Sequence, residues 1–283
     1  MGTLPMMDSK KKNRISNLIL HIFLIIGCVI SIFPFIWMIT TAFKGQADVF
    51  STKLVIFPTE WKIENFNKAI TTIPFGRFYL NTLIITIARV FGQLVIASMA
   101  GYSFARLNFP GRDVLFWAVM AAMMVPFQVT LVPNYILLSK LGWLDSYKGL
   151  IIPSLVSSFG IFMLRQFFLT IPKDLEDAAK VDGCNPFQTF FLVCLPLAKP
   201  ILSSFGFLVA LWSWNDFIWP LIVTRSAKMQ TLSVALSLLQ GQYVSDFGVL
   251  MAAATMTIMP MIILFVFAQK FVIEGITMSG LKL

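Results

Sequence analysis

The chain has 283 residues, of which 58% are hydrophobic and only 12% are charged, and its mean hydropathy is +0.82. A single soluble core of this size does not need so much apolar surface, so the composition excludes a soluble globular protein and indicates a polytopic membrane protein. The formal charge of +9 does not indicate nucleic-acid binding, because the lysines and arginines lie between apolar segments rather than in one patch.

The apolar segments predict an all-α fold with six membrane-spanning helices. Basic residues at 10–14 precede the first segment, which is too long for a cleaved signal peptide. The expected spans are residues 15–43, 78–104, 114–139, 149–164, 201–224 and 247–269. Pro126 and Pro133 predict a kink in the third span.

Three parts are expected along the chain. Residues 1–75 hold the basic N-terminal segment, the first span and the first external loop; a core follows over 76–271; and 272–283 form a tail. Six spans put both termini on the same side as the charged loop at 171–200. That side carries twelve basic residues against nine on the other, a bias in the direction of the positive-inside rule.

The loop at 171–200 predicts a helix, a sharp turn and a second helix. Lys173–Val181 is mostly composed of good helix formers, and Gly183 supplies the left-handed residue that usually ends such a helix. Asn185 is placed to cap the next helix, with a proline at its first position and Gln188 three residues after the cap.

One face of the first of these helices is shallow. Leu175, Ala178 and Ala179 follow i, i+3, i+4 spacing, and two alanines allow another backbone to approach closely. D-A-A-x-x-x-G at 177–183, followed by L-P at 195–196, resembles the EAA loop of ABC importer permeases. In that family the loop couples the permease to the cytoplasmic ATPase by lying in a groove on the ATPase surface.

The resemblance implies a set of ATPase-docking residues: Glu176, Asp177, Ala178, Ala179, Asp182, Gly183, Leu195 and Pro196. Asp177 stands where the family usually has Glu, and Glu176 lies just before it, so the sequence leaves open which acid reaches the ATPase. The alternative interpretation is an ordinary solvated helix in a loop between two spans.

Similarity to the family extends over nearly the whole chain, through FPTEWKIENF in the first external loop and WNDF before a proline in the fifth span. It implies the type I ABC importer permease fold, with 76–271 as permease core, in the bacterial cell membrane. The implied partners are a second, different permease, two ABC ATPase subunits, an external solute-binding protein and the lipid bilayer. Because the docking loop needs cytoplasmic ATPases, both termini are expected in the cytoplasm.

The chain is expected to be a transporter subunit without catalytic site, metal or cofactor. It has no G-x-x-x-x-G-K-[ST] loop, so nucleotide must bind to a partner. The competing polytopic membrane enzyme would need convergent acids, histidines or cysteines, and Asp216 is the only acid inside an expected span. The WNDF segment and the external loop resemble the carbohydrate-importing subgroup; an amino acid, a peptide or phosphate remains the alternative cargo.

Two charges fall inside expected spans. Arg89 lies on a stripe with Thr82, Thr86 and Gln93, and Asp216 shares a helical face with its aromatic and amide neighbours. Both stripes are expected to face the protein interior, where the two charges either pair directly or bond to carbonyl groups and water in a cavity. The candidate pathway residues are Arg89, Gln93, Trp212, Asn215 and Asp216. The tryptophans at 212, 214 and 219 either stack on sugars or mark the membrane interface, and the interface is favoured for 219.

Overall fold

The computed structural model describes the backbone of residues 7–242 and 246–280, and side chains over 16–241 and 246–270. The described backbone contains helices and no strand, which confirms the all-α prediction. The chain divides into two compact units, one of Met1–Ala69 with Gln242–Met256 and the other of Ile70–Gly241 with Thr257–Leu283. The expected division at residues 75 and 271 stays a prediction.

The first unit is organised around the end of a long helix. Its elements are α1 (Met7–Ala42), α2 (Gln46–Val49), most of α3 (Glu64–Thr72) and the first turns of α15 (Phe247–Gly280). The Asn65 side-chain amide donates to the carbonyl groups of Ala42 and Lys44, both at 2.9 Å. These carbonyls at the end of α1 have no partner within the helix, so Asn65 acts as their cap. Gly248 lies against the same cap, where a Cβ atom would be 2.9 Å from the Lys44 oxygen.

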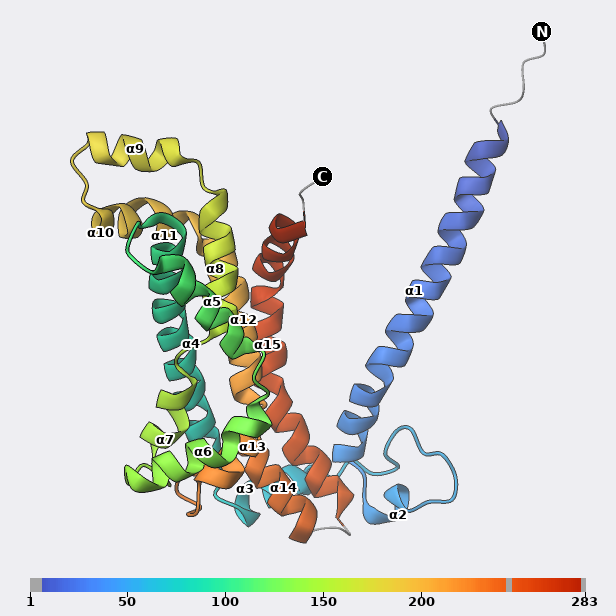
Figure 1. The fold of residues 1–283 in the computed structure, drawn as a ribbon. Coiled ribbons are helices and arrows are strands. Elements are labelled where there is room, and N and C mark those ends of the chain that lie inside the picture. The colour runs from blue at the N-terminus through green and yellow to red at the C-terminus, as the bar shows by residue number, and fades with distance from the viewer. Residues whose placement is uncertain (1–6, 243–245, 281–283) are drawn as a thin grey trace. The chain divides into compact units, whose positions relative to one another are not determined.

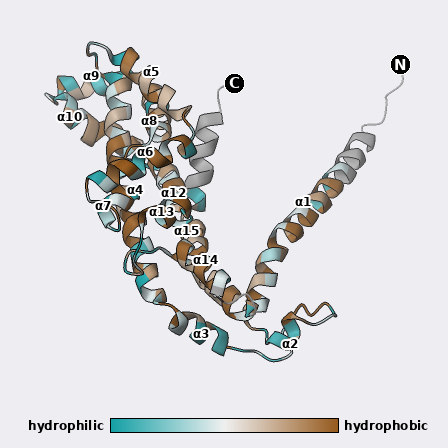
Figure 2. Cartoon of the chain, turned by 60° about the horizontal axis from the view of Figure 1, so that its bottom comes forward, coloured by the Kyte–Doolittle hydropathy of each residue, from teal (hydrophilic) through white to brown (hydrophobic). Residues whose placement is uncertain are grey.

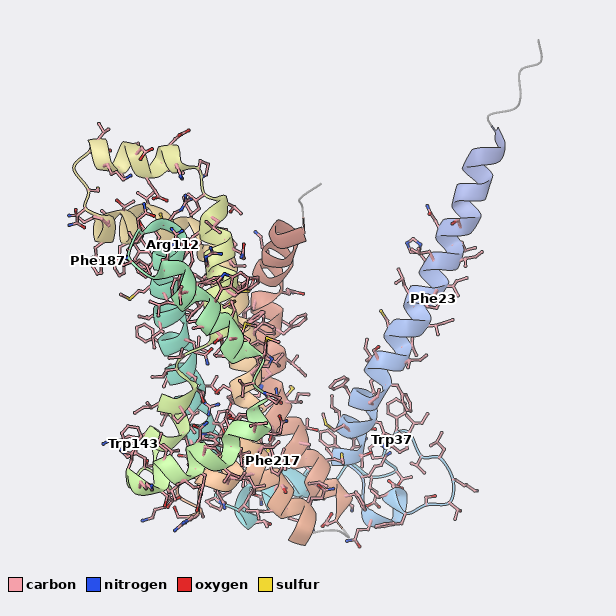
Figure 3. The ribbon with its side chains drawn as sticks, in the orientation of Figure 1. Phe23, Trp37, Arg112, Trp143, Phe187 and Phe217 are labelled. Carbon is pink, nitrogen blue, oxygen red and sulfur yellow. The ribbon has the colours of Figure 1, made fainter. Side chains whose placement is uncertain are left out.

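The second unit holds the remaining helices. These are α4 (Phe75–Arg106), α5 (Arg112–Met123), α6 (Phe127–Lys140), α7 (Tyr147–Ile151), a 3-10 turn (Ile152–Ser154), α8 (Ser158–Thr170), α9 (Lys173–Val181), α10 (Pro186–Thr189), a π-helical turn (Phe190–Cys194), α11 (Leu195–Leu197), α12 (Lys199–Trp214), α13 (Ile218–Val223), α14 (Leu232–Gln242) and the rest of α15. In Figure 1, α9 and α10 lie at one end of α4, and α7 and α13 lie towards the other. Figure 3 shows the same polarity, with Arg112 and Phe187 at the α9 end and Trp143 and Phe217 at the opposite end.

Within the described residues, length and composition give six candidate membrane spans when each sharply bent helix pair is counted as one. Three helices are long and apolar enough by themselves, over Ser16–Ala42, Phe75–Arg106 and Phe247–Lys270. The bent pairs are α5 with α6 at 100°, α7 and its 3-10 turn with α8 at 41°, and α10–α11 with α12 at 77°. Figure 2 shows apolar residues along the long helices and polar residues on α9. The predicted six-span fold is therefore confirmed.

Three expected spans are not single helices. The fourth, expected over 149–164, consists of α7 and its 3-10 turn followed by α8 at 41°. The third was expected to be one kinked helix, but it bends by 100° at Pro126. Proline has no N–H to donate and forces the preceding residue away from helical geometry, so α5 ends just before it. Pro133, in contrast, lies inside α6 without ending it. The fifth was expected to run from 201 to 224, but α12 stops at Trp214, where the Asn215 side chain donates to the Leu211 carbonyl at 2.8 Å. An asparagine bonded to its own backbone in this way competes with continued helix.

Close contacts between α4, α8 and α12 form the centre of the second unit. A Cβ atom at Gly101 of α4 would be 3.0 Å from the Arg165 backbone nitrogen of α8, so glycine is required for this approach. Next to it, Tyr102 packs against Phe168 and Phe190 with ring centroids 5.7 and 5.0 Å away. Small residues and interlocking side chains hold helices together in a bilayer, where lipid provides no hydrophobic drive between them.

At the end of this unit away from α9, the loop after α6 is pinned by a carboxylate. Asp145 accepts hydrogen bonds from the backbone N–H groups of Arg225 and Ser226 at 2.9 and 3.0 Å, and its own N–H donates to the Val223 carbonyl at 2.9 Å. Burial raises the pKa of the Asp145 carboxyl, but the hydrogen bonds from Ser226 and Arg225 and the positive charge of Arg225 together outweigh it and hold that pKa below its usual value. The carboxylate thus joins the α6–α7 loop to the segment after α13.

Candidate functional site

The turn after α9 has the local geometry that the sequence predicts. Gly183 has a φ of +84°, and its N–H donates to the Lys180 carbonyl at 3.0 Å. The Cys184 N–H donates to the Ala179 carbonyl at 2.9 Å, which completes a Schellman motif at the end of the helix. Asn185 and Gln188 then form a reciprocal capping box, with both hydrogen bonds at 2.9 Å. The predicted left-handed glycine and the predicted cap are confirmed.

The second helix of the loop is correctly predicted only at its start. After α10 the backbone widens into the π-helical turn Phe190–Cys194 and continues as the short α11, which contains Pro196. Pro196 has no N–H for the carbonyl four residues earlier, and an inserted wider turn is a common way for a helix to adapt to such an interruption. Leu195 is half-buried and Pro196 is exposed. The L-P pair therefore lies just before the 77° bend that leads into α12.

The two acids of α9 point in different directions. Glu176 and Ala179 are buried at 8% and 6% exposure, whereas Asp177 and Ala178 are exposed. The Glu176 carboxylate lies 2.8 Å from the Arg106 guanidinium at the end of α4, so it is used inside the chain. Ala178 and Ala179 were expected to share a docking face, but successive helical residues point about 100° apart and only Ala178 is accessible.

Asp177 is the acid available to a partner. Its carboxylate is exposed and lies 2.9 Å from the Lys180 ammonium, a hydrogen bond that lowers the pKa of the Asp177 carboxyl. Apolar side chains are exposed on the same helix and on the helix after it, with Leu175 at 43%, Val181 at 89% and Phe187 at 62%. Asp182, the C-cap of α9, and Gly183 are exposed as well. The outer surface of the loop thus combines a carboxylate with apolar and small side chains.

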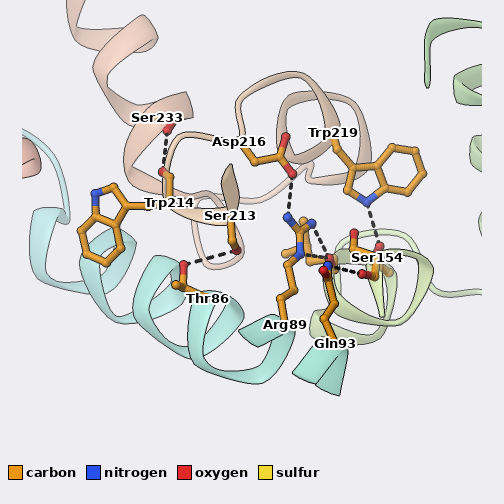
Figure 4. A network of polar contacts seen from close by, with 11 residues as sticks. Thr86, Arg89, Gln93, Ser154, Ser213, Trp214, Asp216, Trp219 and Ser233 are labelled. Atoms are coloured by element: carbon orange, nitrogen blue, oxygen red, sulfur yellow. Dashed lines mark hydrogen bonds and ion pairs between the residues drawn. The ribbon is translucent and has the colours of Figure 1, made fainter. Parts of the chain in front are cut away.

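Inside the membrane region, Arg89 and Asp216 form a direct ion pair, as Figure 4 shows. Arg89 Nη1 lies 2.8 Å from Asp216 Oδ2, and Nε and Nη2 donate to the Leu150 carbonyl at 3.1 and 2.6 Å. The pairing that the sequence left open is confirmed. The sequence argument placed Asp216 on a helical face. That was wrong, because Asp216 lies in the break between α12 and α13. One guanidinium therefore ties α4 to the end of α7 and to this break.

The polar stripe of α4 faces the protein interior, as expected. Thr82, Thr86 and Arg89 are 2%, 7% and 5% exposed, and Thr86 donates to the Ser213 hydroxyl at 3.3 Å. Gln93 donates to the Ser154 carbonyl at 2.6 Å, while its own Oε1 is buried without a hydrogen-bond partner among the described residues. An unpaired buried acceptor is costly unless a ligand or water reaches it.

Arg89, Gln93, Ser213 and Asp216 line a cavity of about 740 Å³ within the second unit, whereas Thr82 and Thr86 do not. Its other lining residues include Phe127, Thr130, Asn134, Ser154, Ser157 and Trp212. Trp212 is 52% exposed. Trp214 and Trp219 are buried, and their indole N–H groups donate to the carbonyls of Thr257 and Gly149 at 3.0 Å. The interface interpretation of Trp219 therefore does not hold, and Asn215 is not among the lining residues.

Sequence reasoning missed several groups at these sites. Arg106 and the cavity residues Thr130 and Asn134 were not singled out as site residues from the sequence. Pro126 and Pro153 could have indicated a cavity from the sequence, because each interrupts a helix. Irregular backbone at membrane depth is tolerated where it is buried in protein or lines a cavity. The Leu150 carbonyl, three residues before Pro153, accepts from Arg89 instead of from the proline, which has no N–H.

Residues 93–277 match the family model described as binding-protein-dependent transport system inner membrane component. The chain belongs to this family. The permease is 35% identical over 256 residues to the arabinooligosaccharides transport system permease protein AraQ of Halalkalibacterium halodurans, covering 89% of this chain and 92% of that protein. It is 29% identical over 275 residues to the sn-glycerol-3-phosphate transport system permease protein UgpE of Brucella suis, covering 94% and 98%.

The fold of this permease also matches a solved structure. A chain of a bacterial ABC transporter involved in the import of the acidic polysaccharide alginate superposes with a TM-score of 0.82 at 23% identity, covering 95% of this permease and 99% of that chain. The permease is thus a membrane-embedded component of a transport system rather than an enzyme.

Proposed function

We propose that this permease is one of two different membrane subunits of an ATP-driven importer with two cytoplasmic ATPases, and that one of these ATPases docks on its 171–200 loop. The observation that carries this proposal is the outward face of α9. Its polar and apolar groups are exposed at one end of the unit, on a helix fixed at both ends by a buried ion pair and a Schellman motif. Asp177, rather than Glu176, is the acid that reaches the ATPase, because Glu176 is already engaged by Arg106.

The same proposal places the 171–200 loop and both termini in the cytoplasm and the segment around Lys62 outside. Docking to ATPases that use cytoplasmic ATP requires this orientation, and the six spans then return both ends of the chain to one side. An external solute-binding protein delivers the cargo from the other side. The solved alginate transporter, a protein of similar fold, has been seen in complex with a periplasmic protein bound to an alginate pentasaccharide.

The proposed cargo is a carbohydrate, and the cavity favours a neutral one. Its lining offers hydroxyl and amide groups, the unpaired Gln93 oxygen and the half-exposed Trp212 ring. Aromatic rings present apolar faces and a polar edge, which suits sugars. Arg89 and Asp216 are the charged residues of the lining, and they neutralise each other. Arabinooligosaccharides, the cargo named for one relative, have this character.

Uptake measurements with Trp212→Ala test the cargo assignment. We expect ATP-dependent uptake of a neutral oligosaccharide by cells that carry the complete importer, and a strong reduction in Trp212→Ala. Trp117→Ala is the matched control, because Trp117 is 70% exposed on α5 and is not among the cavity residues. Uptake of an amino acid, a peptide or phosphate in place of any oligosaccharide would show that the cargo assignment is wrong.

A further inference from the structure

Helix α4 carries two arginines that are both buried in ion pairs with distant parts of the chain. Arg106 pairs with Glu176 at 2.8 Å, and the two side chains are 5% and 11% exposed. Arg89 pairs with Asp216, also at 2.8 Å. Seventeen residues separate the two arginines, which corresponds to about 25 Å along a helix that rises about 1.5 Å per residue. One continuous helix therefore connects the docking loop to the wall of the cavity.

At the docking end, Arg106 holds α9 at two points. Its Nε faces the Glu176 carboxylate in the first turn of α9, and its Nη2 donates to the Ile171 carbonyl just before that helix. A planar guanidinium that engages two groups fixes orientation as well as position. Among the ion pairs of the described residues, this one alone joins α9 to a spanning helix; the exposed Asp177–Lys180 pair lies within α9 itself.

Between the two arginines, α4 is unbroken and contains no proline. It packs against α8 and α12, and Tyr102, one turn before Arg106, contacts Phe190 of the docking loop. Packed interiors shift between discrete arrangements rather than deform continuously. A displacement of α9 is therefore expected to move α4 as a rigid body.

At the cavity, the moving end of this connection is Arg89. Its guanidinium holds both Asp216, in the break between α12 and α13, and the Leu150 carbonyl before the break that leads to α8. Asp216 lies on irregular backbone, and Leu150 lies near the end of the short helix α7, directly before the 3-10 turn, so neither partner is in the middle of a long helix. A change in the position of Arg89 is therefore expected to move both the α12–α13 break and the end of α7.

We propose that the Arg106–Glu176 ion pair is a positioning contact that transmits ATP-driven movement of the docking helix through α4 to the Arg89–Asp216 wall of the cavity. The proposal rests on the proposed function, because it needs an ATPase on α9. It differs from docking itself: Glu176 and Arg106 are buried behind the docking face, so their loss leaves the outer surface of α9 in place.

The test follows the cavity directly and needs no identified cargo. Asn134→Cys, in a background without other cysteines, places a thiol in the cavity lining, and its rate of reaction with a polar maleimide is measured in the purified complex with and without ATP and vanadate. In this reference complex the rate is expected to change severalfold with nucleotide. With Glu176→Gln added, the ATPases are expected to remain bound while the rate no longer responds to nucleotide.

Two further variants make the result decisive. The charge-swapped variant Arg106→Glu/Glu176→Arg is expected to restore the response, whereas Arg112→Gln, which removes the exposed pair with Asp113 near the same end of α4, is expected to leave it unchanged. If Glu176→Gln prevents assembly, recovery of assembly and response in the swap supports the link, and failure of both overturns it. The link is also overturned if the maleimide reaction rate in Glu176→Gln responds fully to nucleotide, or if the rate in the reference complex does not respond to nucleotide at all. Absence of ATPases from the unmodified complex would instead contradict the proposed function on which the link rests.

Discussion

Replacing Arg89 and Asp216 separately and together measures the ion pair that organises the cavity. Removing one partner of a buried charged pair costs about 3–5 kcal/mol, because the other charge is left without compensation. The Asp216 side chain is 23% exposed and faces the cavity, so water can partly replace a lost partner. For Asp216→Ala we therefore expect about 2–3 kcal/mol, near the strength of one charge-assisted hydrogen bond.

Arg89→Ala should cost more, about 3–5 kcal/mol, because it also removes both donors from the buried Leu150 carbonyl. Because the pair is direct, the double variant should be no less stable than Arg89→Ala alone, which corresponds to a coupling energy of about 2–3 kcal/mol. The assay is unfolding of the purified complex in mixed micelles by titration with SDS. The exposed Arg112–Asp113 pair is the control and should show little coupling, since solvent-exposed pairs contribute little. Strictly additive losses at 89 and 216 would refute the reasoning.

Three further outcomes follow from the geometry. Gly183→Val should strain the left-handed turn by about 1–2 kcal/mol and reduce ATPase co-purification without affecting membrane insertion, whereas Gly76→Val, in a helix with open space around it, should do neither. In intact cells, an impermeant thiol reagent should label Lys62→Cys and not Lys180→Cys; the reverse pattern would overturn the orientation. Asp145→Ala should lower the thermal midpoint equally at about pH 5 and about pH 8, since a carboxyl with a depressed folded pKa contributes fully above its unfolded pKa and loses that contribution only as the pH falls through the folded value. A difference that vanished at the lower of these two pH values would contradict this.

Local chemistry explains why the docking loop was predictable. The left-handed glycine, the capping asparagine and the glutamine three residues later each act on neighbouring backbone, so their effect follows from spacing alone. The direction of Glu176 was not predictable in this way. It depends on Arg106, which is about seventy residues away in sequence and reaches α9 only once α4 and α8 have packed.

The intramembrane site shows the same limit. The stripe of α4 was predictable because helical periodicity alone sets it. The cost of an isolated charge in a bilayer predicted that Arg89 and Asp216 face the protein interior, but it left open whether they pair directly, and the fifth span is broken where the argument assumed a helix. The cavity itself arises from breaks at Pro126, Pro153 and Asn215, whose angles depend on neighbouring helices and not on local sequence.

The composition of the complex that assembles around this permease tests the account most directly. An affinity tag on the chain, followed by mild solubilisation and quantification of the recovered polypeptides, measures it. The account predicts one copy of this permease with one copy of a different permease and two ATPase copies, and predicts that Gly183→Val retains the partner permease while losing ATPase. Recovery of this chain alone, or with copies of itself and no ATPase, would contradict the account.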